Sequence, residues 1–149
     1  MTDIERNRDL DIVVYGATGF TGTLVAEYLL RQYGAGKDVR WAIAGRSASK
    51  LADVKQQLGE SAADLEIIVA DSSDKDALAS LANRTRVVLT TVGPYALYGS
   101  TLVAACIEAG SDYCDLAGET QWIRKMIDTY HERARETGAR IVHCCGFDS

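Results

Sequence analysis

The possible folds of this chain are limited above all by the stretch Gly16-Ala17-Thr18-Gly19-Phe20-Thr21-Gly22, which follows the apolar run Ile12-Val13-Val14-Tyr15. Glycines spaced three apart let the backbone turn sharply, approach a ligand without a Cβ atom, and pack the next helix closely on its strand. The first turn of such a helix has free N–H groups and the positive end of the helix dipole, which suit an anionic pyrophosphate. The stretch therefore predicts a strand, a tight turn and a helix with a dinucleotide over the turn. A glycine-rich turn that binds nothing is the alternative.

A P-loop is excluded, because no Gly-Lys-Ser/Thr sequence follows the glycines and the lysine that would reach a terminal phosphate is missing. The length of 149 residues predicts one domain with an ordinary core. A formal charge of -5 argues against a nucleic-acid partner, which needs clustered Lys and Arg. No apolar run approaches the roughly 20 residues of a membrane span, and residues 1–10 are polar, unlike a signal peptide. We therefore expect a cytoplasmic protein without a transmembrane segment.

A metal site is not expected. The candidate ligands are four cysteines and two histidines, namely Cys106, Cys114, Cys144, Cys145, His131 and His143. They contain no paired C-x-x-C spacing of the kind that holds zinc. The adjacent Cys144 and Cys145 form a redox pair only in an alternative interpretation, because neighbouring residues of a strand point to opposite faces.

The end of the second predicted strand, residues 39–44, indicates which dinucleotide is bound. In a mononucleotide-binding half, the residue at this tip, about 20 positions beyond the glycines, faces the adenosine ribose. An acid there accepts the 2′-hydroxyl of NAD, whereas Arg46, Ser47 and Lys50 would hold the 2′-phosphate of NADP. We therefore expect NADP(H). In the alternative interpretation, Ser47 or Ser49 is only an N-cap and Arg46 is a solvated charge.

The ends of the third and fourth predicted strands are also expected to face the crevice at the carboxyl edge of the sheet, where the dinucleotide would lie. Asp71 follows the third strand, residues 65–70, and either accepts from the adenine amine or caps the next turn. Gly93 and Pro94 follow the fourth strand, residues 86–92, and their loop is placed to meet the nicotinamide ribose. A plain turn is the alternative there.

The hydrophobic periodicity of the whole chain predicts the remaining strands and helices. Strands are predicted at 11–15, 39–44, 65–70, 86–92, 112–116 and 140–144, with five helices between them. The first helix is expected to bury a stripe of Phe20, Leu24, Val25, Tyr28 and Leu29, and residues 93–99 are expected to form a loop. Strands joined by helical crossovers pair in parallel. The fold class is therefore α/β: a Rossmann-type, doubly wound parallel sheet of six strands in the order 3-2-1-4-5-6, with helices on both faces.

Five stretches resemble one family of dinucleotide enzymes. They are Gly16 to Gly22, Ala44-Gly45-Arg46-Ser47, Thr91-Val92-Gly93-Pro94-Tyr95, Asp115-Leu116-Ala117-Gly118-Glu119 and Cys145-Gly146-Phe147-Asp148-Ser149. Their order and spacing are similar to those of the saccharopine dehydrogenase-like oxidoreductases, and within that family to the NADP-binding domain of the trans-acting enoyl reductase group. The resemblance implies NADPH as hydride donor. It also implies that residues 1–149 are one NADP-binding domain, with the substrate domain absent from this chain.

These observations predict the cofactor-binding part of an NADP-dependent oxidoreductase that is inactive alone. A second domain would hold a small-molecule or lipid-like acyl substrate. Tyr95 and Tyr98 have no general base beside them in the sequence, so no catalytic residue is assigned. The expected cofactor contacts are Gly16, Thr18, Gly19, Phe20, Thr21, Gly22, Arg46, Ser47, Lys50, Asp71, Val92, Gly93 and Pro94.

Two alternatives stay open. One is a non-catalytic module that senses NADP. The other is an atypical short-chain dehydrogenase, which is disfavoured because no Tyr-x-x-x-Lys lies after the fourth predicted strand.

Overall fold

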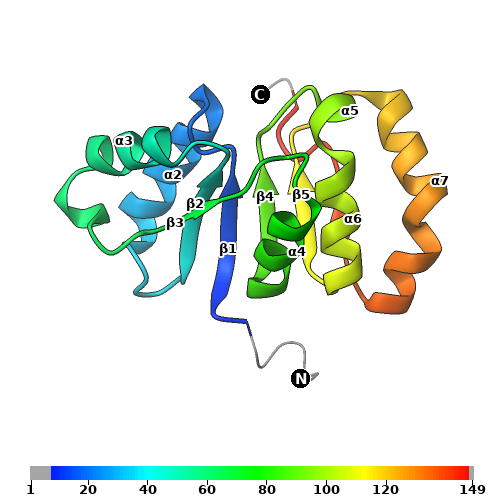
Figure 1. Ribbon diagram of the computed structural model, residues 1–149, viewed down its shortest axis with the longest axis horizontal. Helices are drawn as coiled ribbons and strands as arrows, with labels where there is room; N and C mark the ends of the chain where they lie inside the picture. The colour runs from blue at the N-terminus through cyan, green and yellow to red at the C-terminus, as the bar shows by residue number, and fades with distance from the viewer. Residues whose placement is uncertain (1–7, 148–149) are drawn as a thin grey trace.

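The computed structural model describes residues 8–147, so the motif residues Asp148 and Ser149 lie outside the described range. Strands and helices alternate along the chain (Figure 1). The strands are β1 (Leu10–Tyr15), β2 (Trp41–Gly45), β3 (Glu66–Val69), β4 (Thr85–Thr90), β5 (Asp112–Asp115) and β6 (Ile141–Val142). The helices are α2 (Phe20–Tyr33), α3 (Ala48–Leu58), α4 (Lys75–Arg84), α5 (Tyr95–Tyr98), α6 (Ser100–Ala109) and α7 (Thr120–Thr137), with a short 3-10 helix η1 (Glu60–Ala62).

The strands form one parallel sheet in the order β3-β2-β1-β4-β5-β6, which confirms the predicted Rossmann-type topology. Central β1 pairs with a strand on each side, so that Val13 lies opposite Ala42 and Val88. Because all strands run the same way, the carboxyl ends of β1, β2 and β4 meet at one edge of the sheet. Ligands of doubly wound sheets bind at this edge, where the strand order reverses.

Helices cover both faces of the sheet, as predicted. Successive residues of a strand point to opposite faces, and both Val13 and Val14 are fully buried. Val13 belongs to the core that packs under α4, α6 and α7. Val14 belongs to the core that packs under α2 and α3. Figure 1 shows α2 and α3 on the half of the molecule that holds β2 and β3, and α6 and α7 on the other half.

The predicted buried stripe of α2 is wrong in part. Phe20 is 86 % exposed, and Leu24 and Tyr28 are about half exposed, at 48 % and 50 %. The buried face instead includes the small residues Gly22 and Ala26. This face is buried because Gly22 brings the helix against the glycine turn, where larger side chains would collide with the backbone.

The other strand bounds differ from the sequence prediction by one or two residues, and two elements differ by more. Residues 95–98, predicted as loop, form the short helix α5. Strand β6 has only two residues, Ile141 and Val142, instead of the predicted 140–144. The strand cannot extend to the predicted end at 144, because Cys144 takes a left-handed backbone conformation, with φ of 64°, which a strand does not allow.

Candidate functional site

Hydrogen bonds connect the end of β1 and the beginning of the glycine turn to the ends of both neighbouring strands, β2 and β4. The Gly16 N–H donates to the Ala44 carbonyl at 2.9 Å, and the Thr91 N–H donates to the Tyr15 carbonyl at 3.0 Å. Gly16 has φ of 90°, and a Cβ atom there would approach the Thr91 hydroxyl oxygen to 2.9 Å. A side chain at position 16 would therefore be both strained and crowded. The ends of β2 and β4 therefore set the backbone geometry at the beginning of the β1 to α2 turn.

The two later glycines have different roles. A Cβ atom on Gly22 would lie 2.8 Å from the Cα atom of Ala17, so position 22 needs glycine for the close packing of α2. A Cβ atom on Gly19 would meet only the Gly16 carbonyl oxygen, at 3.5 Å. Gly19 is the N-cap of α2 and supplies no side-chain cap. The N–H groups of the first helical turn lack intrahelical acceptors. Gly19 thus leaves room beside the free N–H groups at the start of α2, an arrangement that suits an anion such as a pyrophosphate.

A crevice of about 310 Å³ runs along the carboxyl ends of β1, β2 and β4. Six of the residues predicted from the sequence line it, namely Gly16, Thr18, Gly19, Arg46, Val92 and Gly93. Seven others do not line it, namely Phe20, Thr21, Gly22, Ser47, Lys50, Asp71 and Pro94. The structure thus gathers the glycine turn, the tip of β2 and the loop after β4 around one hollow, as the Rossmann topology predicts.

The tip of β2 carries Arg46 on the crevice side. Its neighbour Ser47 is the N-cap of α3, and its hydroxyl oxygen accepts the Lys50 N–H at 3.3 Å and lies 3.2 Å from the Ser49 hydroxyl. The capping role that the sequence left open for Ser47 is therefore present in the structure. Lys50 is exposed on the first turn of α3. Arg46, on the wall of the crevice, is the cation of this group that a 2′-phosphate would meet first.

Asp71 follows β3 and shapes a turn. Its Oδ1 atom accepts the backbone N–H of Ser73 at 2.9 Å and the Ser73 hydroxyl at 2.7 Å. These two hydrogen bonds hold the pKa of Asp71 below its usual value, with a smaller contribution from the Arg46 guanidinium. The turn-capping alternative is therefore observed, and Ser72, rather than Asp71, lines the crevice.

The loop after β4 enters the crevice with Val92 and Gly93, and the Gly93-Pro94 peptide is cis. Tyr95 follows and is buried. Its hydroxyl donates to the Thr90 carbonyl at 3.2 Å and accepts the Leu116 N–H at 3.1 Å. Burial raises the pKa of Tyr95 to about 12. The Tyr95 hydroxyl thus links the end of β4 to the residue that follows β5.

Five residues of the crevice were not predicted from the sequence, namely Tyr15, Gly45, Ser72, Thr91 and Tyr98. Tyr15, Gly45 and Thr91 lie at or directly beyond a strand end, and Ser72 lies in the turn three residues after β3, so their position at the carboxyl edge of the sheet is the signal that identifies them. Tyr98 lacks such a signal, because it reaches the crevice through the fold of α5.

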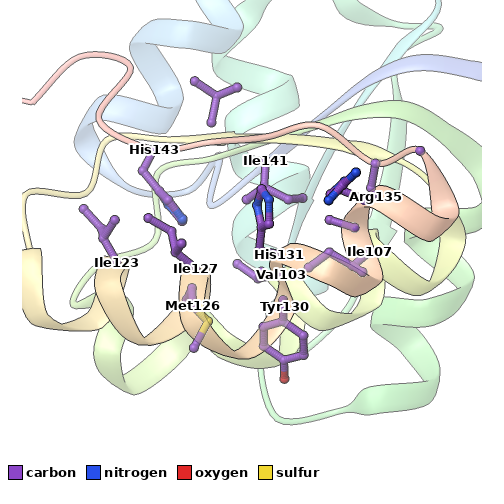
Figure 2. Close-up of a pocket in the computed structure, with 14 residues that line it drawn as sticks. Val103, Ile107, Ile123, Met126, Ile127, Tyr130, His131, Arg135, Ile141 and His143 are labelled. Atoms are coloured by element: carbon purple, nitrogen blue, oxygen red, sulfur yellow. The ribbon is translucent and has the colours of Figure 1, made fainter.

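A larger cavity of about 640 Å³ lies elsewhere, between α7 and the segment that contains β6. Figure 2 shows Ile123, Ile127 and His131 of α7 on the side of the helix that faces Ile141 and His143. None of the predicted cofactor residues lines this cavity. Because its lining lacks the glycine turn and the start of α2, it does not offer the backbone N–H groups of a helix start that would meet a pyrophosphate.

At the end of this cavity His143 meets a buried carboxylate. The Nδ1 atom of His143 lies 2.7 Å from Oδ2 of Asp115, and the Tyr113 hydroxyl donates to the same oxygen at 2.7 Å. Burial raises the pKa of Asp115, but the hydrogen bonds from His143 and Tyr113 outweigh burial and leave that pKa below its usual value. Asp115 also accepts the Cys144 N–H at 3.1 Å, so this network ties the end of β5 to the segment after β6.

Within residues 8–147 the structure contains no group of three or more His, Cys, Asp or Glu side chains arranged to hold a metal ion. Over the same range, no helix is both long enough and apolar enough to cross a bilayer.

Comparison with known proteins supports NADP(H) as the cofactor. The family model of the saccharopine dehydrogenase NADP binding domain matches residues 12–142. A Mycobacterium tuberculosis protein, whose name assigns it provisionally to the trans-acting enoyl reductases, is 56 % identical over 142 residues. A trans-acting enoyl reductase of Mycobacterium ulcerans is 50 % identical over 142 residues. Each alignment covers 95 % of this chain and 33 % of the relative, so the chain spans about a third of the length of these relatives.

Solved structures share the fold. Saccharopine dehydrogenase (L-Glu forming) from Saccharomyces cerevisiae matches with a TM-score of 0.70 at 18 % identity, covering 93 % of this chain and 28 % of that one. The Citrobacter sp. triphenylmethane reductase complexed with NADP(H) matches with a TM-score of 0.64 at 20 % identity, covering 89 % and 48 %. The fold, the glycine turn at its crevice and the family match together show that this chain belongs to the saccharopine dehydrogenase NADP-binding domain family, with NADP(H) as its cofactor.

Proposed function

We propose that this chain holds NADP(H) so that the nicotinamide can transfer hydride to an acceptor bound by a further domain. The acceptor would be a small molecule or a lipid-like acyl group. The proposal is supported by the names of the relatives, which are trans-acting enoyl reductases, and by their length, of which this chain covers 33 %.

The pyrophosphate would lie over the first turn of α2, bound by the backbone N–H groups of residues 20–22, with Gly16, Thr18 and Gly19 beside it. Arg46, Ser47 and Lys50 would hold the 2′-phosphate, since charge-assisted hydrogen bonds from a planar guanidinium and an ammonium suit a dianion. Asp71 would face the adenine through its Oδ2 edge. Val92, Gly93 and Pro94 would border the nicotinamide riboside at the other end of the crevice.

In this arrangement the chain binds and orients, and the bound nicotinamide supplies the hydride. The two buried tyrosines beside the crevice are unsuited to donate a proton. The Tyr15 hydroxyl donates to the Ala70 carbonyl at 2.9 Å, and burial raises its pKa to about 12. The Tyr95 hydroxyl is held between Thr90 and Leu116. A proton donor, where the reaction needs one, would therefore come from the acceptor domain or from Tyr98, the exposed tyrosine that lines the crevice.

The observation that carries the proposal is the crevice itself, which joins a helix start kept open by Gly19 to the exposed cation Arg46. Calorimetric titration of the chain with NADPH and with NADH tests it. We expect NADPH to bind at least about tenfold more tightly, because one charge-assisted hydrogen bond contributes about 1.5–3 kcal/mol. Absence of NADPH binding by the folded chain would overturn the proposal.

A further inference from the structure

The start of α7 holds the short helix α5 through one carboxylate. Oε2 of Glu119 accepts the backbone N–H of Tyr95 at 2.6 Å, and Oε1 accepts the N–H of Ala96 at 3.1 Å. Both oxygens of Glu119 are thus directed at successive N–H groups of α5. These N–H groups belong to the first turn of a helix and have no intrahelical acceptor. Hydrogen bonds to an ionised carboxylate are about twice as strong as neutral ones, so Glu119 fixes where α5 begins.

One helical turn later, Trp122 supports the same element. Its ring centroid lies 5.6 Å from that of Tyr95, and its Nε1–H donates to the Ser100 hydroxyl at 2.9 Å. A Cβ atom on Gly99 would lie 2.8 Å from the Trp122 ring, so α5 and α7 are packed without a gap at that point. The first turn of α7 therefore holds α5 at its beginning and just beyond its end.

Residues 92–94, which include the part of the chain that enters the crevice, are flanked by hydrogen-bonded anchors at both ends. At one end, the Thr91 N–H donates to the Tyr15 carbonyl at 3.0 Å. At the other end, Tyr95 is held by Glu119 and by the Tyr95 hydroxyl bonds to Thr90 and Leu116. Residues 92–94 lie between these anchors, and within them the Val92 N–H donates to the Thr90 hydroxyl oxygen at 3.2 Å. Val92 and Gly93 of this segment line the crevice, as does Tyr98 of α5.

We propose that Glu119 is a positioning residue for the nicotinamide half of the cofactor. The inference rests on the proposed function, because it assigns the two ends of the crevice. Arg46 marks the end beside β2 that would take the adenosine, so the wall of Val92, Gly93 and Tyr98 beside β4 borders the nicotinamide riboside. Glu119 does not line the crevice. It acts through α5, by holding this wall in place.

The test compares two ligands on one variant. NADPH occupies both ends of the crevice, whereas 2′,5′-ADP carries the adenosine and its 2′-phosphate but no nicotinamide. In Glu119→Gln the amide presents a donor to one of the two N–H groups, so the hold on α5 is weakened without a large change in volume. We expect NADPH affinity to fall by roughly fivefold or more, the loss equivalent to about one hydrogen bond, with 2′,5′-ADP affinity unchanged within about twofold.

A second readout and a control variant distinguish this role of Glu119 from a merely structural effect. The fluorescence of bound NADPH reports the surroundings of the nicotinamide ring and should change in Glu119→Gln at saturating ligand. Asp128→Asn is the matched control, since it also removes a carboxylate from α7, but one whose ion pair with Arg124 is exposed and away from α5. The control should bind both ligands as the wild type does.

Equal losses for NADPH and 2′,5′-ADP, or no loss for either, would overturn the inference while leaving NADP(H) binding by the wild type intact. A wild-type chain that binds neither ligand would instead overturn the proposed function and the inference with it. If Glu119→Gln purifies poorly, Glu119→Asp keeps the charge but withdraws it by one methylene group. The same pair of affinities from that variant decides the question.

Discussion

A Cβ atom placed on Gly22 would overlap the carbonyl oxygen of Gly16, because α2 starts in direct contact with the turn that precedes it. Gly19, three residues earlier, has φ of −79°, and a Cβ atom there would make only an ordinary contact, 3.5 Å from the Gly16 carbonyl oxygen. The two glycines of one motif are thus constrained for different reasons: Gly22 by packing within the fold, and Gly19 only by what the crevice must admit.

This difference predicts opposite outcomes for two substitutions. Gly19→Val should fold with a loss of about 1 kcal/mol or less, the cost of a poor N-cap, but should weaken NADPH binding at least about tenfold, because its side chain would stand where the pyrophosphate lies. Gly22→Ala should lower the free energy of unfolding by roughly 3 kcal/mol, because overpacking against backbone cannot relax. Urea unfolding and NADPH calorimetry on both variants check this. Wild-type NADPH affinity in folded Gly19→Val would contradict it.

Reversal of charge at the tip of β2 should change cofactor preference. Arg46→Glu removes a cation from the crevice and places a carboxylate where a ribose 2′-hydroxyl could donate to it. We expect NADPH affinity to fall about tenfold or more, since a charge-assisted hydrogen bond of about 1.5–3 kcal/mol is lost, while NADH affinity is maintained or increases. Arg31→Glu on α2, outside the crevice, is the control for net charge. The measurement is the dissociation constant of each protein for NADPH and for NADH. An unchanged ratio of the two constants in Arg46→Glu would count against a contact between Arg46 and the 2′-phosphate.

The buried Asp115 should make stability depend on pH in a defined direction. Its folded-state pKa lies below the usual value of 3.8, so its contribution is present at neutral pH and is lost as pH falls through the folded pKa. Asp115→Asn should therefore destabilise the fold by about 2–4 kcal/mol at pH 7. The difference from wild type should shrink below pH of about 4. Urea unfolding of both proteins across this range tests the sign, with exposed Asp128→Asn expected to cost under about 1 kcal/mol.

Comparison at each pH cancels the other carboxylates whose pKa values are lowered, such as Asp11 with Arg40. A gap between wild type and Asp115→Asn that widens on acidification would show that Asp115 is not held as the carboxylate in the native state.

The isolated chain should bind NADPH but consume none. Hydride transfer needs an acceptor held within about 3–3.5 Å of the nicotinamide in a site that excludes water. Within the described residues, the walls of the crevice are only the ends of strands, the turns that follow them and the short helix α5. NADPH absorbance with enoyl thioesters or saccharopine-pathway acceptors should stay at the rate of the blank, while NADPH fluorescence still reports binding. Steady turnover by the purified chain would show that it holds the acceptor itself.

The arrangement of the sheet could be predicted from the sequence because its signals are local. The apolar run before Gly16 and the helical periodicities between strands follow from residues close together in the chain. Strands joined by such helices pair in parallel, with right-handed connections. The glycine turn after the first strand identifies the Rossmann pattern, which gives the order of the six strands and places the crevice at their carboxyl ends. The amino-acid sequence alone therefore assigns Gly16, Arg46 and Val92 to one site.

Contacts between distant residues set the remaining features. No local pattern shows that Glu119 would meet the N–H groups of Tyr95 and Ala96, or that this contact would turn a predicted loop into α5. Periodicity likewise placed Phe20 inside, although the close approach of Gly22 to the turn rotates α2 so that Phe20 faces outward. Local sequence is therefore enough to establish which elements form and in what order they pair. The buried face of a helix and the side chain that satisfies an open helix end are settled only when the chain packs, because both depend on atoms that are far apart along it.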